Sequence, residues 1–417
     1  MDAWPQLIFN ISSTKVHGLL LRNTSGFVFE DRVNPMPSVV VRASNTALLN
    51  ALVVELLSTE TMDVLDVEFN NTDAVSGNYL IDIYIPTNML QYVQTTDLTT
   101  AVVYANTLNV NLAADVSIIA EGASNVFVQA DDIGADAILV EARGTSYVQV
   151  TVAQQIMADE LDLVAAGEAS LAVLAGTTST NMFTATNWGP NPIFVGSSVG
   201  ATDVAMLTTT DLLTKAYGSG DVVFLSPGAC NSSLIEASAS GNVYVNSMVC
   251  QDSTALLVNT GNIYLTSIAS LKSADRGTGV VYADLLNDTA VLGTYSLVDS
   301  SAVVLPPFTS VPIPPHAASF IELSASNLTD VSQPSTDATA PPATKHATSS
   351  NSPGHAIEVA LIVIAIAVLF GTLAAFGLYK RKKALTLRSD KITLTGDEEI
   401  EFTTVATPVG DVKTMQV

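Results

Sequence analysis

A hexapeptide that begins with Ser or Thr followed by Gly recurs four times in the chain. Its copies are SGDVVF at 219–224, SGNVYV at 240–245, TGNIYL at 260–265 and TGVVYA at 278–283, which places their glycines at Gly220, Gly241, Gly261 and Gly279. A turn that feeds a β-branched strand about every 20 residues is typical of a parallel β-solenoid, because one coil cannot bury its apolar face without its neighbours. An antiparallel sandwich with regularly spaced turns is the alternative.

Short apolar runs fill much of the chain before this repeat. They lie at 79–85, 102–104, 116–119, 126–128, 138–140 and 147–150, and Gly, Asn, Asp or Ala separate them. Two weaker copies of the hexapeptide, at 124–128 and 145–148, lack its glycine. Only 152–163 has a pattern that a helix could also use. β-branched residues favour strands, so we predict an all-β region over residues 1–304, built as a solenoid with coils of about 20 residues.

A membrane span is predicted at residues 359–379, an uninterrupted run that carries no charge. A helix of about 20 residues, rising about 1.5 Å at each, crosses a hydrocarbon core of about 30 Å, so this run is long enough. A basic cluster follows at Lys380, Arg381, Lys382 and Lys383. Positive charge marks the cytoplasmic flank of a span, so residues 380–417 are predicted to be a cytoplasmic tail at the plasma membrane.

Small residues within this span could allow two helices to approach each other closely. Ala367, Gly371 and Ala375 are spaced four apart and share one helix face. They predict a weak dimer.

A stalk is predicted between the strands and the span, at residues 305–355. Nine of the 17 prolines lie there among Ser, Thr and Ala. Proline removes ladder donors and favours extended chain, so we interpret this segment as a spacer. Three of the four histidines, His316, His346 and His355, lie in it and are expected to be solvated.

The positions of the sequons favour an extracellular location for residues 1–355. Asn-x-Ser/Thr sequons, the acceptor sites for N-glycosylation, occur at Asn10, Asn23, Asn70, Asn231, Asn287 and Asn327, all before the span.

The chain starts Met1-Asp2-Ala3-Trp4-Pro5, without the basic and apolar regions of a signal peptide. We therefore expect the natural start to lie upstream.

The two cysteines of the chain, Cys230 and Cys250, are separated by one length of the local repeat. Adjacent solenoid coils are about 4.8 Å apart, a spacing that suits a disulfide. An oxidising compartment would preserve such a bond. We predict a disulfide between coils; two reduced, buried thiols are the alternative.

Charge restricts the partners that the chain can have. The formal net charge is −24, which disfavours nucleic acid and anionic membranes as partners of the ectodomain. Acidity also keeps a surface protein soluble, and it could attract cations or basic surfaces.

Catalysis is not expected, and no cofactor is predicted. Parallel β-helices include polysaccharide lyases and glycosidases, but Arg143, Lys215, Lys272 and Arg276 are widely separated in the solenoid region. The densest carboxylate group, Asp131, Asp132 and Asp136, is predicted to lie in a turn, with a structural or solvating role or as a calcium clip.

The stretch from about Lys15 to Val150 resembles a known family. Its Gly26-Phe27-Val28-Phe29 strand, its Ile83-Tyr84-Ile85-Pro86 strand end and the rungs that follow, with further copies to about Asp284, are similar to the head GIN domain of autotransporter adhesins. This resemblance implies a right-handed β-helix-like fold on the cell surface and an adhesion role. Many rung glycines are replaced, as at Asn125, and the family pattern has no stalk, span or tail.

The sequence therefore predicts a single-pass type I surface glycoprotein, adhesin-like or structural, whose ligand is a glycan or a protein. A membrane-tethered β-helix enzyme acting on carbohydrates and a receptor that signals through its tail are the two alternatives.

Overall fold

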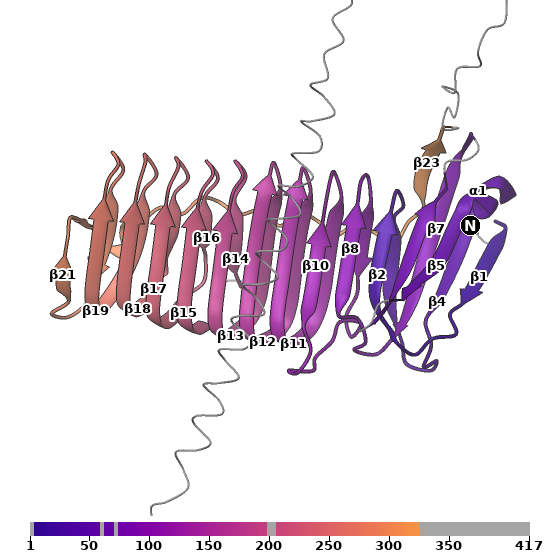
Figure 1. Cartoon of the computed structure of the whole chain (residues 1–417), viewed down its shortest axis with the longest axis horizontal. Coiled ribbons are helices and arrows are strands. Elements are labelled where there is room, and N and C mark those ends of the chain that lie inside the picture. The colour runs from indigo at the N-terminus through magenta and orange to yellow at the C-terminus, as the bar shows by residue number, and fades with distance from the viewer. Residues whose placement is uncertain (1–3, 59–61, 71–73, 198–205, 325–417) are drawn as a thin grey trace, which may run out of the picture. The chain divides into compact units, whose positions relative to one another are not determined.

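The computed structural model describes residues 4–58, 62–70, 74–197 and 206–324. The stretch is an all-β solenoid of about nine turns, as predicted from the repeat (Figure 1). The first strands are β1 (Gln6–Asn10), β2 (Val16–Arg22), β3 (Gly26–Asp31), β4 (Ser38–Ala43), β5 (Leu52–Ser58), β6 (Asp63–Phe69), β7 (Val75–Pro86), β8 (Tyr92–Thr96), β9 (Thr100–Val103) and β10 (Val116–Ala120), with helix α1 (Thr46–Ala51). The later strands are β11 (Asn125–Gly144), β12 (Tyr147–Gly167), β13 (Ser170–Asn187), β14 (Ile193–Gly196), β15 (Leu207–Ala216), β16 (Val222–Phe224), β17 (Gly228–Ala237), β18 (Val243–Leu257), β19 (Ile263–Asp275), β20 (Val281–Leu285), β21 (Ala290–Leu292), β22 (Ser296–Leu297) and β23 (Ser319–Leu323), with the 3-10 turn η1 (Ser300–Ala302).

Each coil runs through two long walls joined by a short side. Wall one contains β3, β9, β14, β16 and β20 together with the first halves of β11, β12, β13, β18 and β19. Wall two contains β2, β8, β10, β15, β17 and β21 together with the second halves of the same long strands. All of these pairings are parallel, which excludes the antiparallel sandwich. The segment 152–163 lies within β12 and is not a helix.

The register repeats once per coil, and this alignment builds the core. In wall one, each inward residue is paired with the corresponding inward residue of the next coil. This inward column is Val126, Val148, Leu171, Ile193, Val222, Val243, Ile263 and Val281, each at most 2% exposed. Aliphatic side chains thus stack directly on one another along the solenoid, so burial of each depends on its neighbours.

Glycines of the hexapeptide occupy a corner where the backbone of successive coils comes very close. A Cβ on Gly241 would lie 2.3 Å from the carbonyl oxygen of Gly220, and one on Gly261 would lie 2.1 Å from that of Gly241. Contacts this short leave no room for a side chain. Glycine at this position is therefore required by close approach between coils.

Gly220, Gly241 and Gly261 are each followed by Asp or Asn, whose side chain forms hydrogen bonds to the next coil. Asp221 Oδ1 accepts from the backbone N–H of Asn242 at 2.8 Å and from Asn242 Nδ2 at 3.1 Å. Asn242 Oδ1 accepts in the same way from Asn262, at 2.9 and 3.1 Å. Asn262 Oδ1 accepts the backbone N–H of Val280 at 3.0 Å. The Gly-Asp/Asn pair of the repeat is thus a steric requirement followed by a hydrogen-bond ladder.

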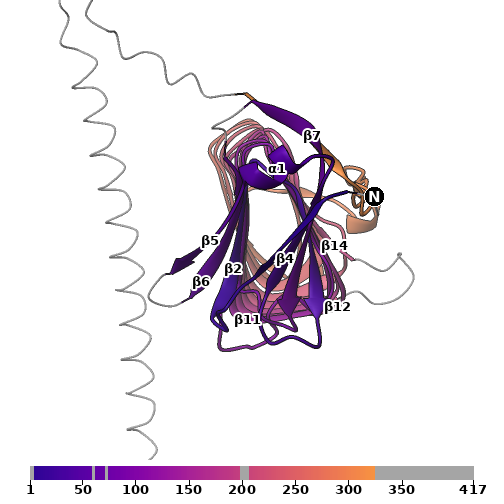
Figure 2. The same cartoon turned by 90° about the vertical axis from the view of Figure 1, so that its right-hand side faces the viewer.

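The N-terminal end of the solenoid is covered by antiparallel strands, which the sequence did not predict (Figure 2). Strand β4 pairs with β1 on one side and with β7 on the other, and β5 pairs with β6, all antiparallel. Helix α1 packs beside them, and its N-cap residue Asn45 accepts the backbone N–H of Leu48 at 2.9 Å. These antiparallel strands pair with strand edges of the solenoid that would otherwise be open.

The predicted boundary at residue 304 differs from the structure. Residues 303–318, here called the strap, run back along the outside of wall one (Figure 1, orange) and lead into β23. Strand β23 then pairs antiparallel with β7, with Ser319 opposite Tyr79 and Leu323 opposite Val75. The proline-rich chain from 305 to 324 is therefore part of the solenoid unit.

Other predictions fall outside the described residues. The remainder of the stalk with His346 and His355, the span at 359–379, the basic cluster, the dimer residues, the tail and the sequon at Asn327 all lie beyond residue 324. Within the described ranges, no helix is long and apolar enough to cross a membrane.

Candidate functional site

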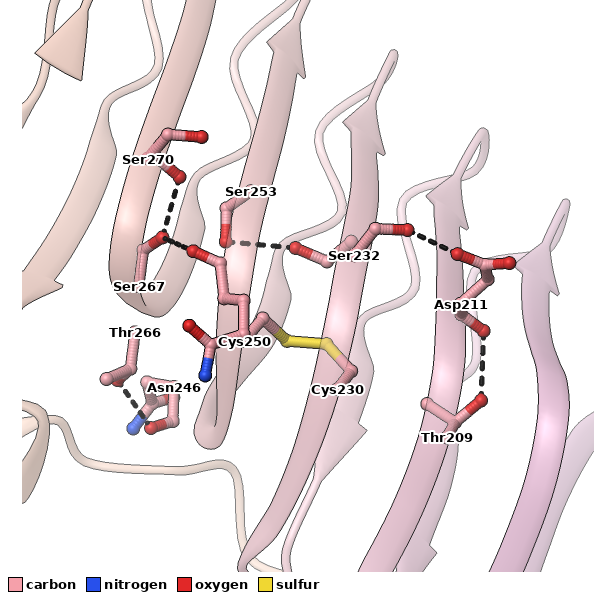
Figure 3. Close-up of a disulfide and its surroundings, with 12 residues drawn as sticks. Thr209, Asp211, Cys230, Ser232, Asn246, Cys250, Ser253, Thr266, Ser267 and Ser270 are labelled. Atoms are coloured by element: carbon pink, nitrogen blue, oxygen red, sulfur yellow. Dashed lines mark hydrogen bonds between the residues drawn. A yellow bond between two sulfur atoms is a disulfide. The ribbon is translucent and has the colours of Figure 1, made fainter. Parts of the chain in front are cut away.

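The two cysteines face each other where the short side of the solenoid leads into wall two (Figure 3). Cys230 of β17 and Cys250 of β18 are direct register partners, with their Cα atoms 4.5 Å apart and their sulfurs bonded. Both side chains are buried, at 5% and 2% exposure. Their sequence separation of 20 corresponds to one coil, and the bond links two neighbouring coils from the inside.

Polar side chains link these two coils to each other and to the coils on either side of them. Ser232 donates a hydrogen bond to Asp211 of the preceding coil (Figure 3). Ser270 donates one to Asp252 of its own preceding coil. Ser233 donates to Ser253 at 3.0 Å in the buried layer beneath them. These bonds hold the beginning of wall two in register from one coil to the next, which gives Asp211 and Asp252 a structural role.

The asparagines of five sequons lie at the surface. Asn10, Asn23, Asn70, Asn231 and Asn287 are all exposed. Asn23 and Asn287 adopt positive φ angles of 49° and 61°, a turn conformation that asparagine tolerates. Each of these five side chains is therefore accessible for modification.

The predicted carboxylate group is not assembled into one site. All three residues lie within the long strand β11 and not in a turn. Ile133, Gly134 and Ala135, which separate Asp132 from Asp136, are buried. Among the residues that the structure describes, no group of His, Cys, Asp or Glu is arranged to hold a metal ion.

An outward column of aromatic and aliphatic residues follows wall one. Its register partners, from β3 to β20, are Phe27, Val102, Phe127, Gln149, Ala172, Phe194, Val223, Tyr244, Tyr264 and Tyr282. The last three rings stack, with centroids 4.7 and 4.9 Å apart and interplanar angles of 2° and 9°. Burial raises the pKa of Tyr244 to about 12, and Asp221 adds to this effect.

The strap covers part of this column. Phe308 packs on Phe194, with centroids 4.9 Å apart, and Ile313 packs against the cluster around Phe127. Gln149, which is 3% exposed, donates to the carbonyl of Val311 at 3.3 Å and accepts its N–H at 3.1 Å. A buried glutamine in an otherwise apolar column thus holds the middle of the strap.

His316, which the sequence predicted to be a solvated linker residue, has a side chain that is 41% exposed but also has specific partners. Its Nε2 lies 2.6 Å from Asp82 Oδ1, and Arg42 donates to the other oxygen of Asp82 at 2.9 Å. Its ring also packs edge-on against Phe27 and Phe29. Proline-rich sequence alone does not reveal these partners, because they come from the opposite end of the solenoid sequence.

A hollow of about 520 Å³ lies beside the strap on wall one, and we name it the aromatic hollow. Its lining residues are Phe29, Glu30, Tyr104, Ala105, Gln129, Ala130, Asp131, Thr151 and Ala153. Phe29 and Tyr104 stack with centroids 4.8 Å apart and an interplanar angle of 10°. On the following coils, three of the five lining residues, Ala130, Thr151 and Ala153, have small side chains.

The charge of the aromatic hollow is negative. Hydrogen bonds from Thr87, Arg32 and Asn106, that from Thr87 the strongest, lower the pKa of Glu30, which keeps this carboxylate ionised. Burial raises the pKa of Tyr104, so its phenol is neutral. The sequence pointed to Asp131 as part of a carboxylate group but did not predict the hollow, since the lining residues come from four separate strands and turns.

Comparisons with known proteins find similarity at the level of structure alone. No protein-family model matches the sequence, and no curated protein is similar to it. One similar structure is a "putative adhesin" from Parabacteroides merdae ATCC 43184, with 10% identity, a TM-score of 0.34, and coverage of 70% of this chain and 96% of that chain. A "putative adhesin" from Parabacteroides distasonis ATCC 8503 has 12% identity, a TM-score of 0.34, and coverage of 71% and 98%. A "putative lipid binding protein" from the same strain has 11% identity, a TM-score of 0.31, and coverage of 70% and 97%. These similarities are too low to indicate a shared function.

Proposed function

We propose that the chain is an adhesin-like surface protein that displays a rigid acidic β-solenoid, has no catalytic activity, and is held at the plasma membrane by the helix predicted at 359–379. The observation that carries this proposal is the disulfide between coils, Cys230–Cys250, on a solenoid whose five described sequon asparagines are exposed. Disulfides persist in oxidising compartments, and N-glycans are added in the secretory pathway. The resemblance to the right-handed head GIN fold is part of this proposal.

Rigidity supports a display role. Stacked coils share one continuous core. The asparagine ladder and the disulfide add links between neighbouring coils, and the strap adds a link between segments that are distant in sequence. A solenoid of this kind presents side chains at fixed spacing over an extended surface, which suits binding to another surface.

The topology can be tested in cells. The full chain, preceded by a secretion signal and carrying one epitope in the turn before β11 and another after Val417, would be expressed in a eukaryotic line. We expect the first epitope to be labelled on intact cells and the second only after permeabilisation. Labelling of the second epitope on intact cells would contradict the proposal.

The two alternatives are tested with the same protein. A glycan array and a reducing-sugar assay on the purified chain separate adhesion from hydrolysis, since an enzyme would release new reducing ends. Deletion of residues 384–417 separates display from signalling, because cell attachment by a display protein should persist without the tail.

A further inference from the structure

The aromatic stack beside the strap ends abruptly at Tyr104. Phe29 stacks on one face of Tyr104, and Tyr84 lies on the far side of Phe29, with ring centroids 5.8 Å apart. The next position along the wall is Gln129, because Phe127 and Val128 pair with Val102 and Val103 in the preceding coil. The second face of the Tyr104 ring therefore borders the aromatic hollow, where a planar group could continue the stack.

Carboxylates stand beside this open ring face. Glu30 and Asp131 both line the hollow. Glu30 is held by Thr87 at 2.6 Å and by Arg32 at 2.9 Å, whereas the side chain of Asp131 has no hydrogen bond or ion pair among the described residues. Asp131 is thus a negative group available to a ligand.

The hollow has the chemistry of a site for a planar cation. Of the described residues that line it, none is Lys, Arg or His, and the whole chain has a net charge of −24. A guanidinium group stacks on an aromatic face and forms paired hydrogen bonds with a carboxylate. A neutral sugar would use the ring face but would leave the charge of Asp131 unmatched.

We propose that the aromatic hollow binds an arginine side chain of a basic protein segment, with the guanidinium stacked on Tyr104 and paired with Asp131. This inference deepens the proposed display function by naming a ligand class, and it rests on that function for its biological role. The partner is an arginine-bearing protein segment that approaches wall one beside the strap.

The test is peptide binding to the purified full chain in a non-ionic detergent, followed by saturation-transfer NMR. The probe is acetyl-Gly-Arg-Gly-amide, and the matched neutral probe contains citrulline, which keeps the shape but lacks the charge. We expect saturation to be transferred from the protein to the arginine side-chain protons of the peptide. The citrulline peptide should bind about tenfold more weakly. Because this comparison needs no variant, a folding defect cannot obscure it.

Variants locate the site. Asp131→Asn and Tyr104→Leu should each weaken arginine binding by about threefold or more, whereas Asp136→Asn, an equal loss of charge on the same strand outside the hollow, should leave it unchanged. Equal weakening in Asp136→Asn, equal binding of the citrulline peptide, or a preference for neutral oligosaccharide would each overturn the proposal. If the display function were wrong, the epitope labelling in cells would show the wrong topology, while the purified protein would still bind the arginine peptide.

Discussion

At the scale of single residues, the corner glycines are the positions where the fold tolerates least change. A Cβ at Gly241 would lie 2.3 Å from a backbone oxygen, and backbone cannot move aside as the tip of a side chain can. We expect Gly241→Ala to lower the free energy of unfolding by about 1–3 kcal/mol or more. Urea denaturation of the purified protein measures this change.

A matched glycine provides the control. At Gly26 the nearest atoms to an added Cβ are side-chain methyls, at 3.3 Å and beyond. Gly26→Ala should therefore cost much less stability than Gly241→Ala. Equal losses in the two variants would show that contact with the backbone is not the cause.

The tyrosine stack predicts how stability depends on pH. Burial raises the pKa of Tyr244 to about 12 in the folded protein, while the unfolded chain titrates near 10. Unfolding therefore releases a proton between these values, and its free energy should be steady below about pH 10 and fall toward pH 12. Tyr244→Phe should reduce this fall, as measured by denaturation across the pH range, and Tyr295→Phe, outside the stack, should leave it unchanged.

At the scale of elements, the disulfide joins β17 to β18 across one coil. We expect peptides containing Cys230 and Cys250 to be recovered linked from protein secreted by eukaryotic cells and mapped without reduction. Closing this loop should stabilise the fold by about 3 kcal/mol on the chain-entropy model, so reduction should lower the midpoint of unfolding. Recovery of two separately alkylated peptides would contradict both the bond and its role.

The strap depends on the glutamine at its centre. Gln149→Ala removes the hydrogen bonds to Val311, and leaves the strap held by Phe308, Ile313 and His316. We expect proteases to cut within residues 303–318 several times faster in this variant, because strap opening exposes that segment. Gln94→Ala, on wall two, should be cut at the wild-type rate. Unchanged cleavage in Gln149→Ala would place the anchor elsewhere.

The sequence predicted some of these elements and missed others for identifiable reasons. Rungs with the Gly-Asn-β-branched pattern were predicted because sterics and hydrogen bonding at each corner demand particular residues. The strap was predicted to be a stalk because proline cannot join a ladder. However, Phe308 and Ile313 bind wall one through side chains alone, without backbone pairing.

Long-range pairing explains the remaining misses. The N-terminal strands lack the repeat, and their antiparallel partners are set by contacts that local sequence does not encode. The aromatic hollow was missed for the same reason, since Phe29, Tyr104 and Asp131 come together only when coils stack.

At the scale of the whole molecule, exposed sequons predict a glycosylated solenoid. Peptide-N-glycosidase should lower the apparent mass of the protein made in a eukaryotic secretory pathway. Asn231→Gln should remove one step of this shift, since Asn231 is exposed beside the disulfide. If the enzyme left the apparent mass unchanged, either the chain would not enter that pathway or its sequons would not be accessible.

The return of the strap decides how a mechanical load would enter the molecule. Because β23 ends on β7, the chain leaves the solenoid at the end where it began, and the coil containing β21 and β22 is the end remote from this exit. Tension applied beyond residue 324 would act first on the short strand β23 and then on the strap. The stacked coils lie outside this force path, so they would stay folded while β23 separates from β7. The strap would then extend and lengthen the chain before the load reaches the coils.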